Sequence, residues 1–209
     1  METAKVPQVA ISTWNIDPAH TVAEFKLKHM MITNVKGHFS GVSGALSLDE
    51  HDVTNSKIDV TIPTVRISTR ETERDTHLKS ADFFDVETFP TITFKSTKVV
   101  QQPDDQLEAK GECAIHGFNS ASGVQRRDGD LEVEGDLTIR GITRKVRLAV
   151  EGPTHAVKDP WGRTRIGASA IAKINRKDYG LAWNAALETG GLMVGDEVTI
   201  TIDAEFIKA

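Results

Sequence analysis

The sequence contains one cysteine, Cys113, among 209 residues. A single thiol cannot form an intrachain disulfide, and a Cys-rich metal motif is excluded. No stretch approaches the roughly 18 consecutive apolar residues of a transmembrane helix, so no integral membrane segment is predicted. The N-terminus also lacks the apolar run and small-residue cleavage site of a secretory signal, and the expected location is therefore cytoplasmic.

Basic residues are not in excess. The 25 Lys and Arg are outnumbered by 30 Asp and Glu, giving a formal net charge of −5. The one dense basic run, at 144–147, alternates like the solvent face of a strand, so nucleic acid is not expected as a partner.

Common catalytic signatures are missing as well. The chain has no Gly-x-Ser-x-Gly elbow, P-loop, Gly-x-Gly-x-x-Gly fingerprint or His-Glu-x-x-His pair. The seven histidines occur singly, and none lies four residues from another as a helical metal pair would. The sequence therefore predicts neither an enzyme nor a bound metal or cofactor.

The dominant pattern is an alternation of apolar and polar residues with a period of two, which is typical of half-buried strands. Turn residues separate the alternating segments. Eight strands are predicted, at 23–29, 35–48, 57–62, 91–96, 131–140, 145–150, 165–174 and 197–206. That number suits an all-β, closed antiparallel barrel, whose interior is either filled by side chains or holds one small ligand.

Two segments depart from simple alternation. Ser68 and Glu71 have capping-box spacing and predict a short helical insertion over about 69–80. It ends before the adjacent Phe83 and Phe84, at least one of which we expect to plug the end of the barrel. Residues 107–118 resemble 131–142, which predicts a long hairpin, although alternation alone could produce the likeness.

Three polar residues have alternative interpretations. His29 is in phase with Phe25 and Leu27 and is expected to face the lumen, either as a core histidine or as a contact for a ligand head group. His77 and Asp82 either form hydrogen bonds that fix the end of the helix or lie at the mouth of a pocket.

Several blocks occur in a specific order along the chain. They lie at 14–20 (followed by Phe25 and His29), 35–41, 74–96, 135–146, 159–170, 174–181 and 194–200. Through them the sequence resembles the YceI-like proteins. The resemblance implies a lipocalin-like eight-stranded barrel with a helical insertion and a tunnel for isoprenoid lipids such as polyprenyl phosphates or quinones, used in carriage or storage. The missing export signal and the additional hairpin-like segment near 101–128 depart from the family pattern.

We expect an N-terminal tail over 1–13 and one barrel domain over 14–209. Strand phase and block position give the candidate lumen residues Phe25, Leu27, His29, Phe39, Phe94, Leu137 and Ile139. Candidates for the ends of the tunnel are His77, Asp82, Phe83, Phe84, Trp161, Tyr179 and Trp183. Each apolar candidate could instead fill a packed core, and Trp161 could simply cover an edge from its turn.

Two other functions remain open at this point. One is a hydrolase or isomerase acting on a small lipid, which requires His29, His77 and Asp82 to converge within hydrogen-bond reach. The other is a partner-binding module in which the hairpin over 107–142 adds to the sheet edge of another chain. A homodimer is a further candidate, independent of these two functions.

Overall fold

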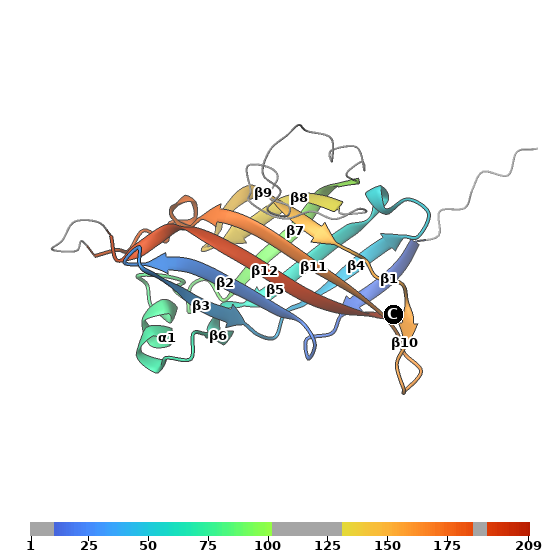
Figure 1. Ribbon diagram of the computed structural model, residues 1–209, viewed down its shortest axis with the longest axis horizontal. Coiled ribbons are helices and arrows are strands. Elements are labelled where there is room, and N and C mark those ends of the chain that lie inside the picture. Colours follow the sequence, from blue (N-terminus) through green and yellow to red (C-terminus); the bar gives the residue numbers. More distant parts are fainter. Residues whose placement is uncertain (1–10, 102–130, 186–191) are drawn as a thin grey trace, which may run out of the picture.

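The computed structural model describes residues 11–101, 131–185 and 192–209 (Figure 1). These residues form one twelve-stranded sheet. Its strands are β1 (Ile11–Ile16), β2 (Val22–His29), β3 (Thr33–Phe39), β4 (Ser43–Asp49), β5 (Lys57–Pro63), β6 (Ile67–Ser68), β7 (Thr91–Gln101), β8 (Leu131–Ile139), β9 (Ile142–Glu151), β10 (Val157–Lys158), β11 (Thr164–Asn175) and β12 (Val194–Lys208). The described helices are α1 (Thr72–Lys79) and the 3-10 turns η1 (Val53–Asn55), η2 (Thr64–Arg66) and η4 (Arg176–Tyr179).

The sheet closes on itself. Neighbouring strands follow the order β11, β9, β8, β7, β5, β4, β1 and β12, and β12 pairs again with β11. All pairings are antiparallel, and the β11–β12 ladder runs from Arg165 opposite Ile207 to Asn175 opposite Glu197. The predicted closed eight-stranded antiparallel barrel with one short helix is therefore confirmed. The order of strands continues from β12 into β2, β3 and β6, so β2 and β3 form a two-stranded ribbon beside β12.

The identity of the eight strands differs from the prediction. The segment 35–48 is two strands, because the chain turns at Gly41, whose φ of +71° favours glycine. Strand β1 was not predicted, and it begins at Ile11, inside the expected tail. Its pairing with β4 and β12 is set by tertiary contacts that a six-residue segment does not reveal by alternation.

The predicted helix is present but starts later than expected. Its N-cap is Glu71, whose carboxylate accepts hydrogen bonds from the backbone N–H groups of Glu73 and Arg74. Ser68 instead accepts a hydrogen bond from the backbone N–H of Arg70, so the capping box assigned to Ser68 and Glu71 is wrong. No residue of α1 is fully buried, and the helix lies outside the barrel at one end (Figure 1).

The long hairpin predicted over 107–142 is described only in its second half. Strand β8 pairs with β7 along one edge and with β9 along the other, whereas residues 107–118 lie outside the described residues. The hairpin that β8 does form runs directly into β9 through Arg140 and Gly141. The rest of the segment near 101–128 lies outside the described residues. Among the described helices, none has the length and apolar character needed to cross a bilayer.

Candidate ligand-binding cavity

The inner face of the barrel encloses a cavity of about 570 Å³. Cavities that bury a drug-sized ligand have volumes of roughly 300–1,000 Å³, so the interior is large enough for such a guest. The wall is built by alternate residues of the strands, whose side chains point to one face of the sheet. Aliphatic wall residues include Leu46, Ile58, Val60, Ile62, Val133, Leu137, Val146, Leu148, Ile174, Val198, Ile200 and Ile202.

Many of these inward-facing side chains are not fully buried. Leu46, Val60, Val146 and Ile200 pack against the buried core cluster and face the cavity, yet each retains accessible surface. In a barrel filled by side chains, residues at such positions pack against one another and lose nearly all of it. Because the strands shield them from outside solvent, their remaining surface faces the cavity, and the barrel is hollow.

Small side chains leave this space open on β11. Ala168, Ala170 and Ala172 occupy successive inward positions of that strand and line the cavity. A methyl group extends only a short way from the sheet, so this part of the wall stays close to the backbone.

Two glycines widen the interior in another way. A Cβ atom on Gly37 would lie 2.3 Å from Cζ of Phe25, and one on Gly135 would lie 2.3 Å from Cζ of Phe94. Each phenyl ring thus rests against bare glycine backbone on a neighbouring strand.

Polar lining residues mark where the cavity reaches the surface. Glu71 and Glu73 are exposed and also line the cavity, so it opens beside α1. Arg74 and His77 of the same helix contribute to this opening. Lys57, at the start of β5, is likewise both exposed and lining.

Three rings meet beside α1, and we call them the mouth cluster: His77, Phe83 and Trp183. The ring centroid of His77 lies 5.0 Å from that of Phe83 and 4.7 Å from that of Trp183, both edge to face. Phe83 and Trp183 are 5.3 Å apart. Nε2 of His77 lies 2.9 Å from Oδ2 of Asp82, which orients the imidazole within the cluster.

A buried arginine holds the backbone on which Trp183 sits. Arg176 is 3% exposed and donates hydrogen bonds to the carbonyls of Leu181, Trp183 (2.9 Å) and Gly195 (3.0 Å). Burial lowers the pKa of its guanidinium, and Asp196 at 3.3 Å partly offsets this. Sequence reasoning missed this residue, because nothing in the run Arg176–Lys177 distinguishes a buried arginine from its exposed neighbour.

Eleven of the fourteen sequence candidates line the cavity. They are Phe25, Leu27, His29, Phe39, His77, Phe83, Phe84, Phe94, Leu137, Ile139 and Trp183. Their part in binding stays a prediction. Asp82 does not line the cavity itself but contacts His77.

Two candidates lie away from the cavity, contrary to the sequence interpretation. Trp161 is 77% exposed in the turn between β10 and β11, with the Arg163 guanidinium 5.8 Å from its ring. Tyr179 is 1% exposed in η4, and burial raises the pKa of its hydroxyl to about 12. That hydroxyl has no hydrogen-bond partner among the described residues.

The three polar residues of the hydrolase hypothesis do not all come together. His77 and Asp82 form a pair, whereas no hydrogen bond in the described part of the chain joins His29 to either of them. His29 lines the cavity from the end of β2.

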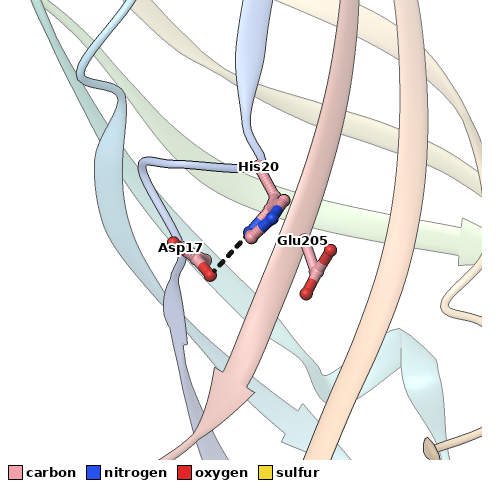
Figure 2. A group of neighbouring side chains, drawn as sticks. All are labelled: Asp17, His20 and Glu205. Carbon is pink, nitrogen blue, oxygen red and sulfur yellow. Dashed lines mark hydrogen bonds and ion pairs between the residues drawn. The ribbon is translucent and has the colours of Figure 1, made fainter. Parts of the chain in front are cut away.

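An ionic cluster joins the strands where the barrel closes. Asp17, His20 and Glu205 lie close enough together to hold a metal ion (Figure 2). Nη1 of Arg165, however, lies 2.7 Å from Oδ2 of Asp17 and also donates to Glu205, so a guanidinium already supplies the positive charge between the carboxylates. Its hydrogen bond holds the pKa of Asp17 well below the usual range. We therefore interpret the cluster as structural.

Asp159 is the third carboxylate on this arginine. Its Oδ2 lies 2.8 Å from Nε of Arg165. Burial on its own would raise the pKa of Asp159, but the hydrogen bonds from Arg165 and from the backbone N–H groups of Arg163 and Trp161 lower it to about 2. Arg165 thus ties the β1–β2 connection, the β10–β11 turn and β12 together.

A closed antiparallel barrel around an open apolar cavity is the architecture of the lipocalin-like binding barrels. Comparison with known proteins narrows this class: the chain belongs to the YceI-like family, whose domain matches residues 14–206. A UPF0312 protein of Staphylococcus aureus is 34% identical over 197 residues, covering 94% of this chain and 98% of the relative.

Solved structures agree on the fold. A YceI protein of Campylobacter jejuni is 26% identical, with a TM-score of 0.60 over 88% of this chain and 91% of its own. BcnA of Burkholderia cenocepacia superposes with a TM-score of 0.65 at 19% identity, over 91% and 98% of the two chains. A polyisoprenoid binding domain from Saccharophagus degradans gives 0.59 at 12% identity, over 96% and 100%. At such low identity, the last two show the fold alone.

Proposed function

We propose that this protein binds an amphiphilic isoprenoid lipid in its barrel and carries or stores it, without catalysis. The observation that carries the proposal is the hollow apolar interior, whose wall residues keep surface that only a guest could cover. Membership of the YceI-like family supports it, and the fold is shared with a domain described as polyisoprenoid binding.

The energy of such binding comes from the chain of the lipid. Each buried methylene-sized group contributes about 0.8 kcal/mol, so two five-carbon prenyl units gross roughly 8 kcal/mol before the costs of ordering and association. An apolar wall can supply this without polar contacts.

The polar end of the lipid belongs at the opening beside α1. Arg74 uses Nε and Nη2 to bond Thr69, at 2.7 and 3.1 Å, and its Nη1 has no partner in the described part of the chain. Arg74 thus provides a donor next to the apolar cavity, beside the ring of His77. A phosphate or a quinone oxygen can accept such hydrogen bonds, which is why polyprenyl phosphates and isoprenoid quinones are the proposed cargo.

Extraction of lipid from protein purified without detergent tests the proposal. Native mass spectrometry is expected to show a bound species, and chromatography of the extract with mass spectrometry to identify it as a polyprenyl phosphate or an isoprenoid quinone. Recovery of only fatty acids or phospholipids, together with failure of the stripped protein to take up added prenyl lipid, contradicts it.

A hydrolase or isomerase is the second candidate, favoured by the His77–Asp82 pair at 2.9 Å. A carboxylate oriented on an imidazole is how a general base is often held. If the protein is such an enzyme, wild type turns over a small lipid ester or isomerises a small lipid, and the His77→Gln variant loses this activity. The binding proposal predicts that no product forms with either protein.

The assembly and the cellular location stay predictions. A homodimer predicts twice the monomer mass by light scattering, and removal of residues 104–127 tests whether that segment contributes to a partner contact. Cell fractionation tests the cytoplasmic location.

A further inference from the structure

The turn between β2 and β3 carries three exposed apolar residues. Met30, Met31 and Ile32 are 38%, 66% and 79% exposed. The backbone N–H of Ile32 donates to the carbonyl of His29 at 3.1 Å, and φ is +50° at Met30 and +61° at Met31. These features are those of a type I′ turn, and we call residues 30–32 the apolar tip.

The residues of the apolar tip are poorly suited to their positions. Type I′ turns favour asparagine and glycine, because both central residues need positive φ. Methionine at such a φ is uncommon, and side chains exposed this far gain nothing from burial. The tip is nevertheless held in place, since the backbone N–H of Met30 donates to the carbonyl of Met193 at 2.7 Å. Leu192, next to that anchor, is exposed as well.

Positive charge lies directly behind the apolar tip. Lys26, Lys28 and Lys36 are exposed on the outer face of the β2–β3 ribbon. Lys26 pairs with Lys36 across the two strands, an arrangement of like charges that destabilises a sheet. None of the three lysines forms an ion pair within the described residues. This basic strip lies on a chain whose net charge is −5.

The same ribbon forms part of the cavity wall. Leu27, His29 and Val35, on its inner face, all line the cavity. In Figure 1 the turn that joins β2 to β3 lies at the left-hand end of the barrel, the end that also carries α1. The apolar tip and the opening beside α1 thus share one end of the molecule.

We propose that this end docks on the surface of an anionic lipid membrane, with the apolar tip inserted among the lipids and the three lysines against their phosphates. Exposed apolar side chains backed by lysines are the combination that binds such interfaces. The lysines favour a negatively charged surface. The exposed apolar side chains of the tip favour a lipid membrane over a soluble acidic protein, because a membrane offers an apolar interior into which they can insert. The inference goes beyond the proposed function, because docking requires no lipid inside the barrel.

Co-sedimentation with vesicles tests the proposal, using full-length protein stripped of lipid. One set of vesicles is pure phosphatidylcholine, and the other contains phosphatidylglycerol. We expect binding to the anionic vesicles that weakens as salt is raised. A lysine near such a surface contributes about fivefold in affinity, so three predict a preference on the order of a hundredfold over neutral vesicles.

Two variants separate the contributions. Met31→Ser with Ile32→Ser is expected to weaken binding to anionic vesicles by more than about tenfold, because the inserted apolar surface is lost. Lys26→Gln, Lys28→Gln and Lys36→Gln together are expected to abolish the preference for anionic lipid. The matched control is Val157→Ser with Lys158→Gln, which changes an exposed apolar and an exposed basic residue on β10 and is expected to bind as wild type.

Thermal melting of each variant establishes that it is folded. Absence of wild-type binding to anionic vesicles overturns the proposal, and so does equal binding by the tip variant and the control. If wild type forms dimers that the tip variant loses, as measured by light scattering, and wild type does not bind vesicles, the apolar tip serves self-association instead. Uptake of prenyl lipid delivered from detergent is measured separately, so failure of docking and failure of cargo binding are distinguishable.

Discussion

The open interior depends on a few individual side chains. On β11 three successive inward positions are alanines, and on β3 and β8 Gly37 and Gly135 let Phe25 and Phe94 lie against the backbone. Larger residues at these sites would convert the same barrel into a packed one. The volume of single side chains therefore decides whether this fold can hold a guest.

Replacing Ala170 by phenylalanine tests this point through stability. Overpacking a filled core costs about 1–3 kcal/mol, whereas a ring added to an empty apolar cavity gains burial. We expect Ala170→Phe to unfold in urea with a free energy equal to or above that of wild type. A loss of more than about 1 kcal/mol contradicts a hollow barrel.

The Asp17–Arg165 pair predicts a defined acid sensitivity. The hydrogen bond from Arg165 holds the pKa of Asp17 below the value of about 4 that it has in the unfolded chain. The ion pair therefore stabilises the folded protein fully above about pH 4, and this contribution is lost as the pH falls below that value. We expect Asp17→Asn to lower the free energy of unfolding at pH 7 by about 1–3 kcal/mol. The difference between variant and wild type should shrink as pH falls from about 4 to 2, measured by urea unfolding. A difference that stays constant over this range argues against the assignment.

Strand phase predicted the direction of individual residues well where alternation is strict. Phe25, Leu27 and His29 were assigned to the interior from their spacing alone, and all three line the cavity. Alternation carries no information on volume, so it could not distinguish a cavity from a core. It also gave no weight to Ala170 or to Arg176, whose roles depend on neighbours distant in sequence.

At the scale of elements, the segment that follows η4 depends on Arg176. Its guanidinium donates hydrogen bonds to the carbonyls of Trp183, in this segment, and of Gly195, on β12. The side-chain amide of Asn184 donates a further hydrogen bond to the carbonyl of Val194 at 2.7 Å. Trp183 is thereby held against His77 and Phe83.

Arg176→Lys is expected to loosen this segment, because one ammonium group cannot reproduce the planar set of donors. We expect a loss of at least about 2 kcal/mol of unfolding free energy. We also expect greater quenching of Trp183 by acrylamide, measured in a Trp161→Phe background in which the other remaining tryptophan, Trp14, is 2% exposed. Lys177→Gln is the matched control on the adjacent, exposed residue and should change stability by less than about 0.5 kcal/mol. Equal quenching in the two variants would exclude a positioning role for Arg176.

Element boundaries show where local sequence stops being sufficient. The helix was predicted because residues 69–80 lack strand alternation. Its start is set by the carboxylate of Glu71, which is the N-cap itself, whereas the spacing of Ser68 and Glu71 indicated Ser68 as the N-cap. The turn at Gly41 lies within an apolar-polar run that continues on both sides, so one strand was predicted where two exist.

At the scale of the whole molecule, the closed barrel could be predicted because several short segments, each weak evidence alone, all show strand alternation. The number of period-two segments predicted the closed barrel, and the ordered blocks that resemble the YceI-like family indicated its type. The order of strands around the ring could not be predicted, since it depends on the pairing of β1 with both β4 and β12. These contacts join the two ends of the chain.

We expect the barrel to take up a long prenyl chain into its open interior. Titration of stripped protein with a fluorescent polyprenyl phosphate measures this uptake directly. Ala170→Phe fills the cavity, and the control is Ala149→Phe, the same change on the neighbouring strand β9 outside the cavity lining. We expect saturable binding by wild type and Ala149→Phe, and binding weakened more than about tenfold by Ala170→Phe, since most of the affinity comes from apolar burial. Equal affinity for all three proteins, or no binding by wild type, contradicts this expectation.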